Sequence, residues 1–271
     1  MIRLLFILLV AGSAVLRAAD PTVVTVSPQE PVAKELPLPG EVFSVAGRPA
    51  FLIAANGNAD GKSKPWVWYA PTLPNYPGTE ERWMFEKFRE AGIAIAGIDV
   101  GESYGSPAGR ALFSQLHAEM TEKRGYSRKP VLLGRSRGGL MTLSWAAANS
   151  DKVAAFAGIY PVCNIASYPG VAKAAPAYEM TAEALQAGLA AHNPLDRLAP
   201  LANASMPLFA IHGDNDKIVP LEDNSASLKS RYEALGGSMR LIVPPGQGHN
   251  LWQGFFQCQE LVTFVITHAK P

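Results

Sequence analysis

Short apolar runs alternate with segments of helical spacing along the chain from residue 80 onward. The apolar runs predict strands at residues 93–98, 130–133, 153–159, 207–211 and 240–243. The spaced segments predict helices at residues 80–91, 108–123, 138–149, 222–235 and 251–268. Strands that are apolar on both faces and separated by helices are typical of a mostly parallel sheet between two helical layers. We therefore expect an α/β fold.

Two other parts of the chain have different patterns. Residues 41–45, 49–55 and 65–70 are predicted strands with a turn at 56–61, and we expect them to open the sheet as antiparallel strands. Residues 166–205 contain helical pieces but no good strand. A segment of that length is too long for an ordinary connection, so it is predicted to form a small helical lid or a rim insertion.

The N-terminus has the layout of a secretory signal. Residues 4–16 are apolar or small and carry no charge, and Arg3 and Arg17 flank them. This run is too short for a comfortable membrane span, so residues 1–20 are predicted as a signal peptide and residues 21–271 as one α/β domain. The alternative is an uncleaved anchor, because Arg17 spoils a small-x-small cleavage site. We expect a periplasmic or secreted protein without a stable membrane partner.

Composition narrows the possible partners. Of the 271 residues 17% are charged and the formal net charge is +1, which gives no electrostatic basis for binding nucleic acid. Cys163 and Cys258 are the two cysteines. They could pair in an oxidising compartment or remain as two buried thiols, and the sequence leaves both open.

A candidate nucleophile follows the predicted strand 130–133. The stretch from residue 134 to 138 reads Gly-Arg-Ser-Arg-Gly and leads into the predicted helix 138–149. Ser136 then lies on a tight strand-to-helix turn, where a Cβ at Gly134 or Gly138 would collide with its neighbours. The helix N-terminus adds a partial positive field where an oxyanion would form. No Lys-Ser/Thr follows the glycines, which argues against a phosphate loop.

A serine hydroxyl needs a base, and the base needs a group that orients it. Of the five histidines, His249 is the one on a loop directly after a predicted core strand, so we expect it to be the base. Asp214 and Asp216 both follow the strand 207–211, and we choose Asp216 because Asp214 suits an Asx turn. A paired-carboxylate metal site is the rival interpretation, but no further ligands have suitable spacing. We expect no metal and no cofactor.

The order Ser136, Asp216, His249 is that of the α/β-hydrolase fold. The run from residue 212 to 220, H-G-D-N-D-K-I-V-P, resembles the acid loop of the prolyl-oligopeptidase-like and dienelactone-hydrolase-like branches, and G-Q-G-H before residue 250 resembles their histidine loop. The resemblance covers most of the chain from about residue 41. It implies a serine hydrolase in which the aspartate before x-x-V-P is the acid of the triad, which supports Asp216.

The resemblance also implies an oxyanion hole. One donor would be the Arg137 N–H, and the second would come from the loop after residue 69: Thr72 is our choice, with the Leu73 N–H and the Tyr69 hydroxyl as alternatives. The run Ser-Arg-x-Gly is also similar to glucuronoyl esterases, where the arginine helps the oxyanion. The Arg137 side chain could do this or bind a substrate carboxylate, or it could pair with an acid such as Glu102 or Asp99.

Two aromatic residues are candidates for binding substrate. Tyr104 follows strand 93–98 and Trp252 follows His249, so they could form an aromatic wall, although packing is the simpler explanation. The short stretch before residue 66 leaves no room for the propeller of true prolyl oligopeptidases. We therefore expect an esterase acting on small esters or acylated saccharides (acetyl or feruloyl). The alternatives are a small prolyl-oligopeptidase-like peptidase and a non-catalytic binding protein.

Overall fold

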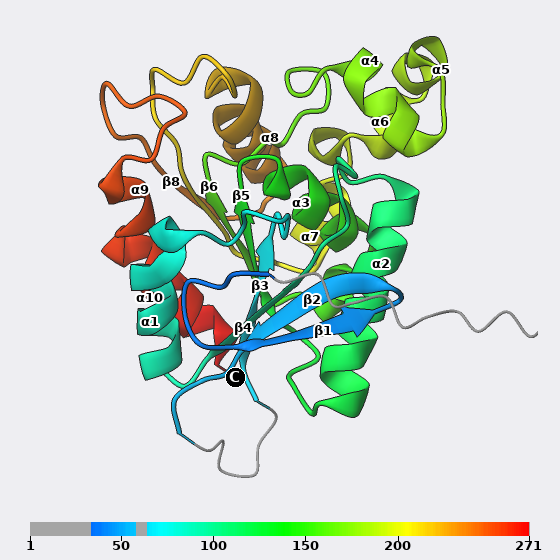
Figure 1. Cartoon of the computed structure of the whole chain (residues 1–271). Coiled ribbons are helices and arrows are strands. Elements are labelled where there is room, and N and C mark those ends of the chain that lie inside the picture. The colour runs from blue at the N-terminus through cyan, green and yellow to red at the C-terminus, as the bar shows by residue number, and fades with distance from the viewer. Residues whose placement is uncertain (1–33, 58–63, 271) are drawn as a thin grey trace, which may run out of the picture. The chain divides into compact units, whose positions relative to one another are not determined.

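An eight-stranded sheet forms the centre of the protein in the computed structural model, which describes residues 34–57 and 64–270 (Figure 1). The predicted signal peptide lies outside the described residues. The strand order is β1-β2-β4-β3-β5-β6-β7-β8. The strands are β1 Glu41–Val45, β2 Arg48–Ile53, β3 Trp66–Ala70, β4 Ala94–Ile98, β5 Val131–Arg135, β6 Ala155–Ile159, β7 Leu208–Ile211 and β8 Met239–Ile242.

Strand directions give the sheet a mixed character. β1 pairs antiparallel with β2 and β2 with β4, whereas the pairs from β4 through β3 to β8 are parallel. The predicted α/β fold is confirmed. One detail was wrong, because β3 belongs to the parallel part of the sheet and not to its antiparallel opening. All five residues of β3 are buried, as expected for a parallel strand that is covered on both faces.

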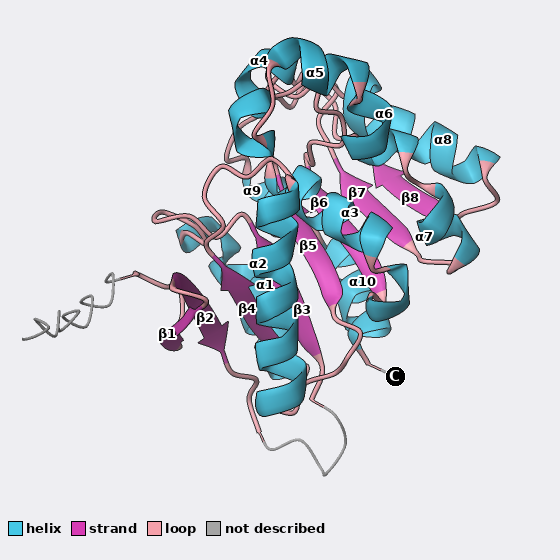
Figure 2. Cartoon of the chain, turned by 90° about the vertical axis from the view of Figure 1, so that its right-hand side faces the viewer, coloured by secondary structure: helices cyan, strands magenta, loops and turns pink. Residues whose placement is uncertain are grey.

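Helices cover both faces of the sheet (Figure 2). They are α1 Arg82–Glu90, α2 Pro107–Ala118, α3 Gly138–Ala148, α4 Val171–Ala174, α5 Ala182–Ala187, α6 Leu189–His192, α7 Ala199–Asn203, α8 Ser227–Ala234, α9 Gln253–Phe256 and α10 Gln259–Ala269. Within the described residues, none of them has the length and hydropathy that crossing a membrane would require.

Alternation along the strands divides the interior into two cores. In β3, Trp66 and Trp68 pack into a core with residues of α2, α3, α7 and α8, whereas Val67 and Tyr69 pack into a second core with residues of α1, α9 and α10. Successive strand side chains point to opposite faces, so one strand feeds both cores. Each helical layer is thereby fixed against the same sheet by burial of apolar surface.

Three predicted helices differ in detail from the structure. The helix at 108–123 ends as an α-helix at Ala118 and continues as a π-helical turn, and the helix at 222–235 begins with such a turn. The helix at 251–268 is two helices, α9 and α10, separated by Gln257 and an extended Cys258. The break lets Phe255 and Phe256 of α9 and the apolar face of α10 all pack into the same core.

The segment 166–205 forms short helices, and its described residues contain no strand. α4, α5 and α6 lie together at one end of the sheet in both views (Figure 1, Figure 2). Their apolar side chains share a separate small core with Tyr104, Leu140 and Val162. That the segment acts as a lid stays a prediction. Cys163 and Cys258 are free buried thiols.

Candidate active site

The turn between β5 and α3 holds Ser136 in a strained backbone conformation. Its φ is +51°, a region that residues other than glycine rarely adopt. Backbone hydrogen bonds fix the turn from both sides. The Ser136 N–H donates to the Ile159 carbonyl at 3.0 Å, and the Ser136 carbonyl accepts from the N–H groups of Gly139 at 2.9 Å and Val162 at 2.8 Å. The hydroxyl is therefore held at the end of β5 by the neighbouring strand and the following loop.

Two glycines make this turn possible. A Cβ built on Gly138 would lie 2.1 Å from the Ala70 carbonyl oxygen, and one on Gly134 would lie 2.8 Å from Thr142 Oγ1. The first contact is with backbone, which cannot move aside without disturbing β3. The tight packing predicted for the Gly-x-Ser-x-Gly stretch is present around both glycines.

His249 lies within hydrogen-bond distance of this hydroxyl. It belongs to the loop after β8, and its Nε2 is 2.8 Å from Ser136 Oγ. Its Nδ1 is 2.7 Å from Asp216 Oδ2. A carboxylate only accepts, so Nδ1 carries a proton and Nε2 is left to accept the serine proton. The ring of Tyr160, the first residue after β6, packs on the imidazole with centroids 4.3 Å apart.

Asp216 is a buried carboxylate with a full set of donors. Besides His249, its Oδ1 accepts from the N–H groups of Ile218 at 2.9 Å and Val219 at 2.8 Å. Burial alone would raise the pKa of Asp216, but hydrogen bonds from His212, His249 and the Val219 N–H hold that pKa well below its ordinary value. The carboxylate therefore stays ionised next to His249.

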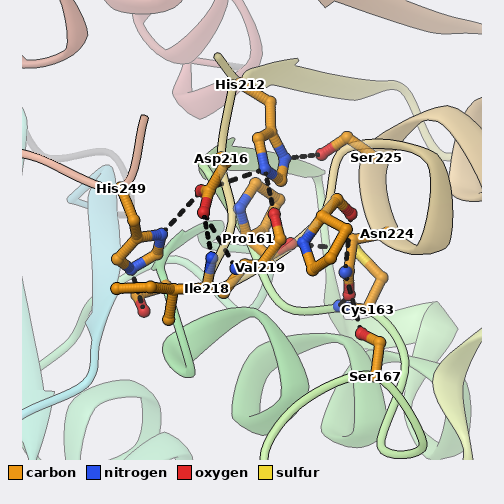
Figure 3. A network of polar contacts seen from close by, with 12 residues as sticks. Pro161, Cys163, Ser167, His212, Asp216, Ile218, Val219, Asn224, Ser225 and His249 are labelled. Carbon is orange, nitrogen blue, oxygen red and sulfur yellow. Dashed lines mark hydrogen bonds and ion pairs between the residues drawn. The ribbon is translucent and has the colours of Figure 1, made fainter. Parts of the chain in front are cut away.

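His212 contacts the same carboxylate from another side, so Asp216 lies between two imidazoles (Figure 3). Its Nε2 is 2.8 Å from the Val219 carbonyl and 3.3 Å from Asp216 Oδ2, and its Nδ1 is 2.8 Å from Ser225 Oγ. The Val219 carbonyl can only accept, so Nε2 is the protonated nitrogen. The sequence analysis selected only His249 among the histidines and so missed this contact, although the place of His212 in H-G-D-N-D was a signal.

Asp214, the alternative acid, points elsewhere. Its Oδ1 accepts from the Gly246 N–H at 2.6 Å, which connects the acid loop to the loop that holds His249. A second connection is made by Asn215, whose N–H donates to the Gln247 carbonyl at 2.9 Å. The expected Asx turn at Asp214 is thus replaced by a contact between loops. Asp216 is the aspartate that reaches His249.

A pocket of about 420 Å³ opens over Ser136 and His249. Its other walls combine arginine, tyrosine and apolar side chains: Pro71, Tyr76, Arg135, Arg137, Tyr160, Tyr168, Ile218, Asn250 and Leu251. The aromatic wall predicted from Tyr104 and Trp252 is formed instead by the three tyrosines. Neither Tyr104 nor Trp252 is among the lining residues: Tyr104 is buried in the small core under the 166–205 segment, and Trp252 is exposed and packs on Phe255.

The two arginines beside Ser136 differ in their surroundings. Arg135 is buried and donates to Glu81 Oε1 at 2.7 Å, and Glu81 is fully buried. Burial by itself would lower the pKa of Arg135, but Tyr69 and Glu81 raise it, so the guanidinium stays charged. Arg137 lies nearer the surface, with its Nε 3.3 Å from Glu102 Oε2, the pairing weighed from sequence.

The structure distinguishes between the candidate hydrogen-bond donors of the oxyanion hole. The Arg137 N–H precedes α3, where helix geometry leaves it without an intrahelical acceptor. The Tyr69 hydroxyl donates to Glu81 Oε1 at 2.7 Å and is excluded, because it is committed inside the core. The Thr72 side chain is buried and donates to the Tyr69 carbonyl at 3.3 Å, so only its N–H is left for this role. Thr72 as the second donor stays a prediction.

Comparison with known proteins identifies the family to which this chain belongs. The sequence profile described as the prolyl oligopeptidase family matches residues 116–266, more than half of the chain. This range contains Ser136, Asp216 and His249. A search of curated protein sequences finds no match.

Solved structures share the fold at low sequence identity. The chain is similar to Est1E from Butyrivibrio proteoclasticus, with 16% identity and a TM-score of 0.64 over 86% of this chain and 99% of that chain. It is also similar to a puromycin-hydrolyzing peptidase of Mycobacterium tuberculosis, with 15% identity and a TM-score of 0.67. That match covers 85% of this chain and 40% of the peptidase. Porphyromonas gingivalis dipeptidyl peptidase 4 gives 14% identity, a TM-score of 0.67, and coverage of 85% and 35%.

The close approach of α3 to β3 gives a first testable prediction. Gly138→Ala should lower the free energy of unfolding by at least about 1–3 kcal/mol, the usual cost of overpacking, because its Cβ meets backbone. Gly188→Ala is the matched control, since its Cβ would lie no nearer than 3.5 Å to any neighbour. Urea denaturation measures both. Equal stabilities of the two variants would contradict the packing described for the turn.

The lowered pKa of Asp216 gives a second prediction. Its ionised form stabilises the fold above the unfolded-state pKa of about 3.9, and this contribution is lost as the pH falls from there toward the lower folded-state pKa. The stability difference between the wild type and Asp216→Asn should therefore shrink below about pH 4, by at most about 1.4 kcal/mol per pH unit. Denaturant titrations at pH 5 and pH 3 test this. A difference that grows on acidification would be inconsistent with a stabilised carboxylate.

Proposed function

The chain belongs to the prolyl oligopeptidase family of serine hydrolases, and we propose that it hydrolyses carboxylic esters through an acyl-enzyme on Ser136. The observation that supports this proposal most directly is the pair of distances, 2.8 Å from Ser136 Oγ to His249 Nε2 and 2.7 Å from His249 Nδ1 to Asp216 Oδ2. Each donor faces an acceptor, so a proton can pass from the serine to the imidazole without a change of tautomer.

The proposed reaction has two stages. Ser136 Oγ attacks the carbonyl carbon of the ester while His249 Nε2 takes its proton. The tetrahedral intermediate then collapses, and the imidazolium gives that proton to the departing alcohol. A water molecule next attacks the acyl-enzyme, with His249 again taking the proton, and the acid leaves as the Ser136 hydroxyl is restored. Asp216 stabilises the imidazolium in both stages and keeps its ring in place.

Two groups are proposed to stabilise the oxyanion. The Arg137 N–H lies beside the nucleophile at the N-terminus of α3, where the helix dipole adds positive potential. The Thr72 N–H is proposed as the second donor, because it is on the loop after β3 and next to Pro71, which lines the pocket. Donors of this kind each account for a factor of about 10²–10³ in kcat in other serine hydrolases.

The pocket wall favours an ester over a peptide that is recognised by its free amino terminus. Its described lining contains two arginines and no aspartate or glutamate. A protonated amino group would find no carboxylate among these residues, and the two glutamates nearby, Glu81 and Glu102, are already paired with the arginines. An alcohol is also a better leaving group than an amine, so ester cleavage demands less of the general acid. A cavity of about 420 Å³ admits a small ester or the acyl end of an acylated saccharide.

A peptidase is the second candidate, and the family match itself favours it. The same triad chemistry cleaves amides when the pocket holds the peptide and His249 protonates the amine. The two candidates differ in substrate and not in mechanism, so parallel assays on esters and amides separate them.

We also propose that the enzyme is exported to the periplasm or secreted. The support is the uncharged apolar run 4–16 between Arg3 and Arg17. N-terminal sequencing of the protein recovered from the culture medium or periplasm of an expressing bacterium would identify the cleavage site.

The proposed activity predicts the outcome of a substitution at the nucleophile. Ser136→Ala should lower kcat for p-nitrophenyl esters by more than about a thousandfold, because the acyl-enzyme cannot form. Ser238→Ala, an exposed serine before β8, is the control and should keep wild-type turnover. Proline p-nitroanilide, assayed in parallel, should be cleaved far more slowly than the esters.

Two results would count against this function. Unchanged ester turnover in Ser136→Ala would show that Ser136 is not the nucleophile. Efficient cleavage of the anilide with no ester turnover would show that the enzyme is a peptidase and not an esterase.

A further inference from the structure

From the charges of the pocket wall we infer that the substrate of this enzyme carries a free carboxylate, which the Arg137 guanidinium binds. The inference rests on the proposed ester hydrolysis and names its substrate class. The described residues that line the pocket include Arg135 and Arg137 but no acidic side chain. Arg135 is paired with buried Glu81, but Arg137 has only the partly exposed Glu102 beside it, so a substrate carboxylate that replaces Glu102 would be held next to the serine.

Arg137 is the arginine that can change partner. Its side chain is 25% exposed and that of Glu102 is 45% exposed, so both partners lie partly at the surface. The pair is also poorly formed: Arg137 Nε lies 3.3 Å from Glu102 Oε2, yet this buried nitrogen makes no hydrogen bond to any described residue. Exposed pairs contribute at most about 1 kcal/mol, so a substrate carboxylate that bonds the guanidinium with both oxygens can displace Glu102.

Arg135 has a different role, because it is buried and already paired with a buried carboxylate. Its side chain is 7% exposed, donates to the fully buried Glu81, and lies 4.8 Å from the ring centroids of both Tyr76 and Phe256. The Arg137 guanidinium is 5.9 Å from the same Tyr76 ring. Arg135 therefore holds the tyrosine against which Arg137 rests. It is a positioning residue, and Arg137 is the group that touches the carboxylate.

The remaining wall is consistent with one anionic end and one apolar end of the substrate. Burial raises the pKa of Tyr160 to about 12, so this phenol stays neutral and does not repel an anion. Ile218 and Leu251 are 55% and 57% exposed at the rim of the pocket. Their exposed apolar surface suits the hydrocarbon part of a small ester and gains free energy when the substrate covers it.

Matched pairs of esters test the inference on either side of the scissile bond. Mono-p-nitrophenyl glutarate carries a carboxylate on the acyl side, and p-acetoxybenzoate carries one on the alcohol side. The methyl ester of each is the neutral partner. The measured quantity is the ratio of kcat/KM for the acid to kcat/KM for its methyl ester, corrected for the uncatalysed rates. In at least one pair the ratio should exceed about ten, the factor expected for one charge-assisted contact.

Variants of Arg137 and Glu102 test whether this ratio of kcat/KM values depends on the Arg137 guanidinium. Arg137→Gln should reduce it about tenfold, and Arg137→Lys should restore part of it because the charge returns without the planar fork. Glu102→Gln should raise the ratio, since the competing carboxylate is gone. Arg240→Gln is the control, an arginine 62% exposed and paired with Glu260, and should leave the ratio unchanged. Thermal melting of each variant shows that it is folded.

The outcomes separate this inference from the proposed function. If the neutral esters are turned over and the ratios are near one in both pairs, or if Arg137→Gln does not change the ratio, the inferred substrate carboxylate is wrong. The proposed esterase activity would not be affected by that result. Failure of all four esters would overturn both.

Discussion

The left-handed backbone of Ser136 is the constraint on which the rest of the site depends. A φ of +51° costs free energy of order 1–3 kcal/mol, and it persists because β6 and the loop after it hydrogen-bond the residue on both sides. Gly138 allows α3 to approach Ala70 so closely that no side chain fits between them. The hydroxyl is thus presented at the carboxyl end of β5, where the loops after β7 and β8 can reach it.

The other half of the site is two loops joined to each other. Asp214 and Asn215 of the acid loop hydrogen-bond Gly246 and Gln247 of the histidine loop, so the position of one loop fixes that of the other. Asp216 is held between two imidazoles and two backbone N–H groups, which keeps it charged while buried. A buried carboxylate with this many donors is an oriented fixed charge, and His249 is positioned by it.

Local patterns predicted much of this arrangement. Apolar runs located the parallel strands, and the Gly-x-Ser-x-Gly turn, the acid loop and the histidine loop pointed to Ser136, Asp216 and His249. The direction of β3 was missed, since pairing depends on neighbours distant in sequence. The pocket wall was missed for the same reason: Tyr76 comes from the loop after β3, whereas Tyr160 and Tyr168 come from the loop after β6. Tyr104 and Trp252 follow a strand and a site residue closely in sequence, but neither is among the residues that line the pocket.

Covalent labelling tests most directly whether the three residues act together. An organophosphorus fluoride reacts with a serine only when a base takes its proton, and mass spectrometry of peptides locates the adduct. We predict one adduct per chain, on the peptide that contains Ser136, and a labelling rate that falls by at least about a hundredfold in His249→Ala. His268→Ala should label at the wild-type rate. An adduct on another residue, or equal labelling of the His249 variant, would contradict the account.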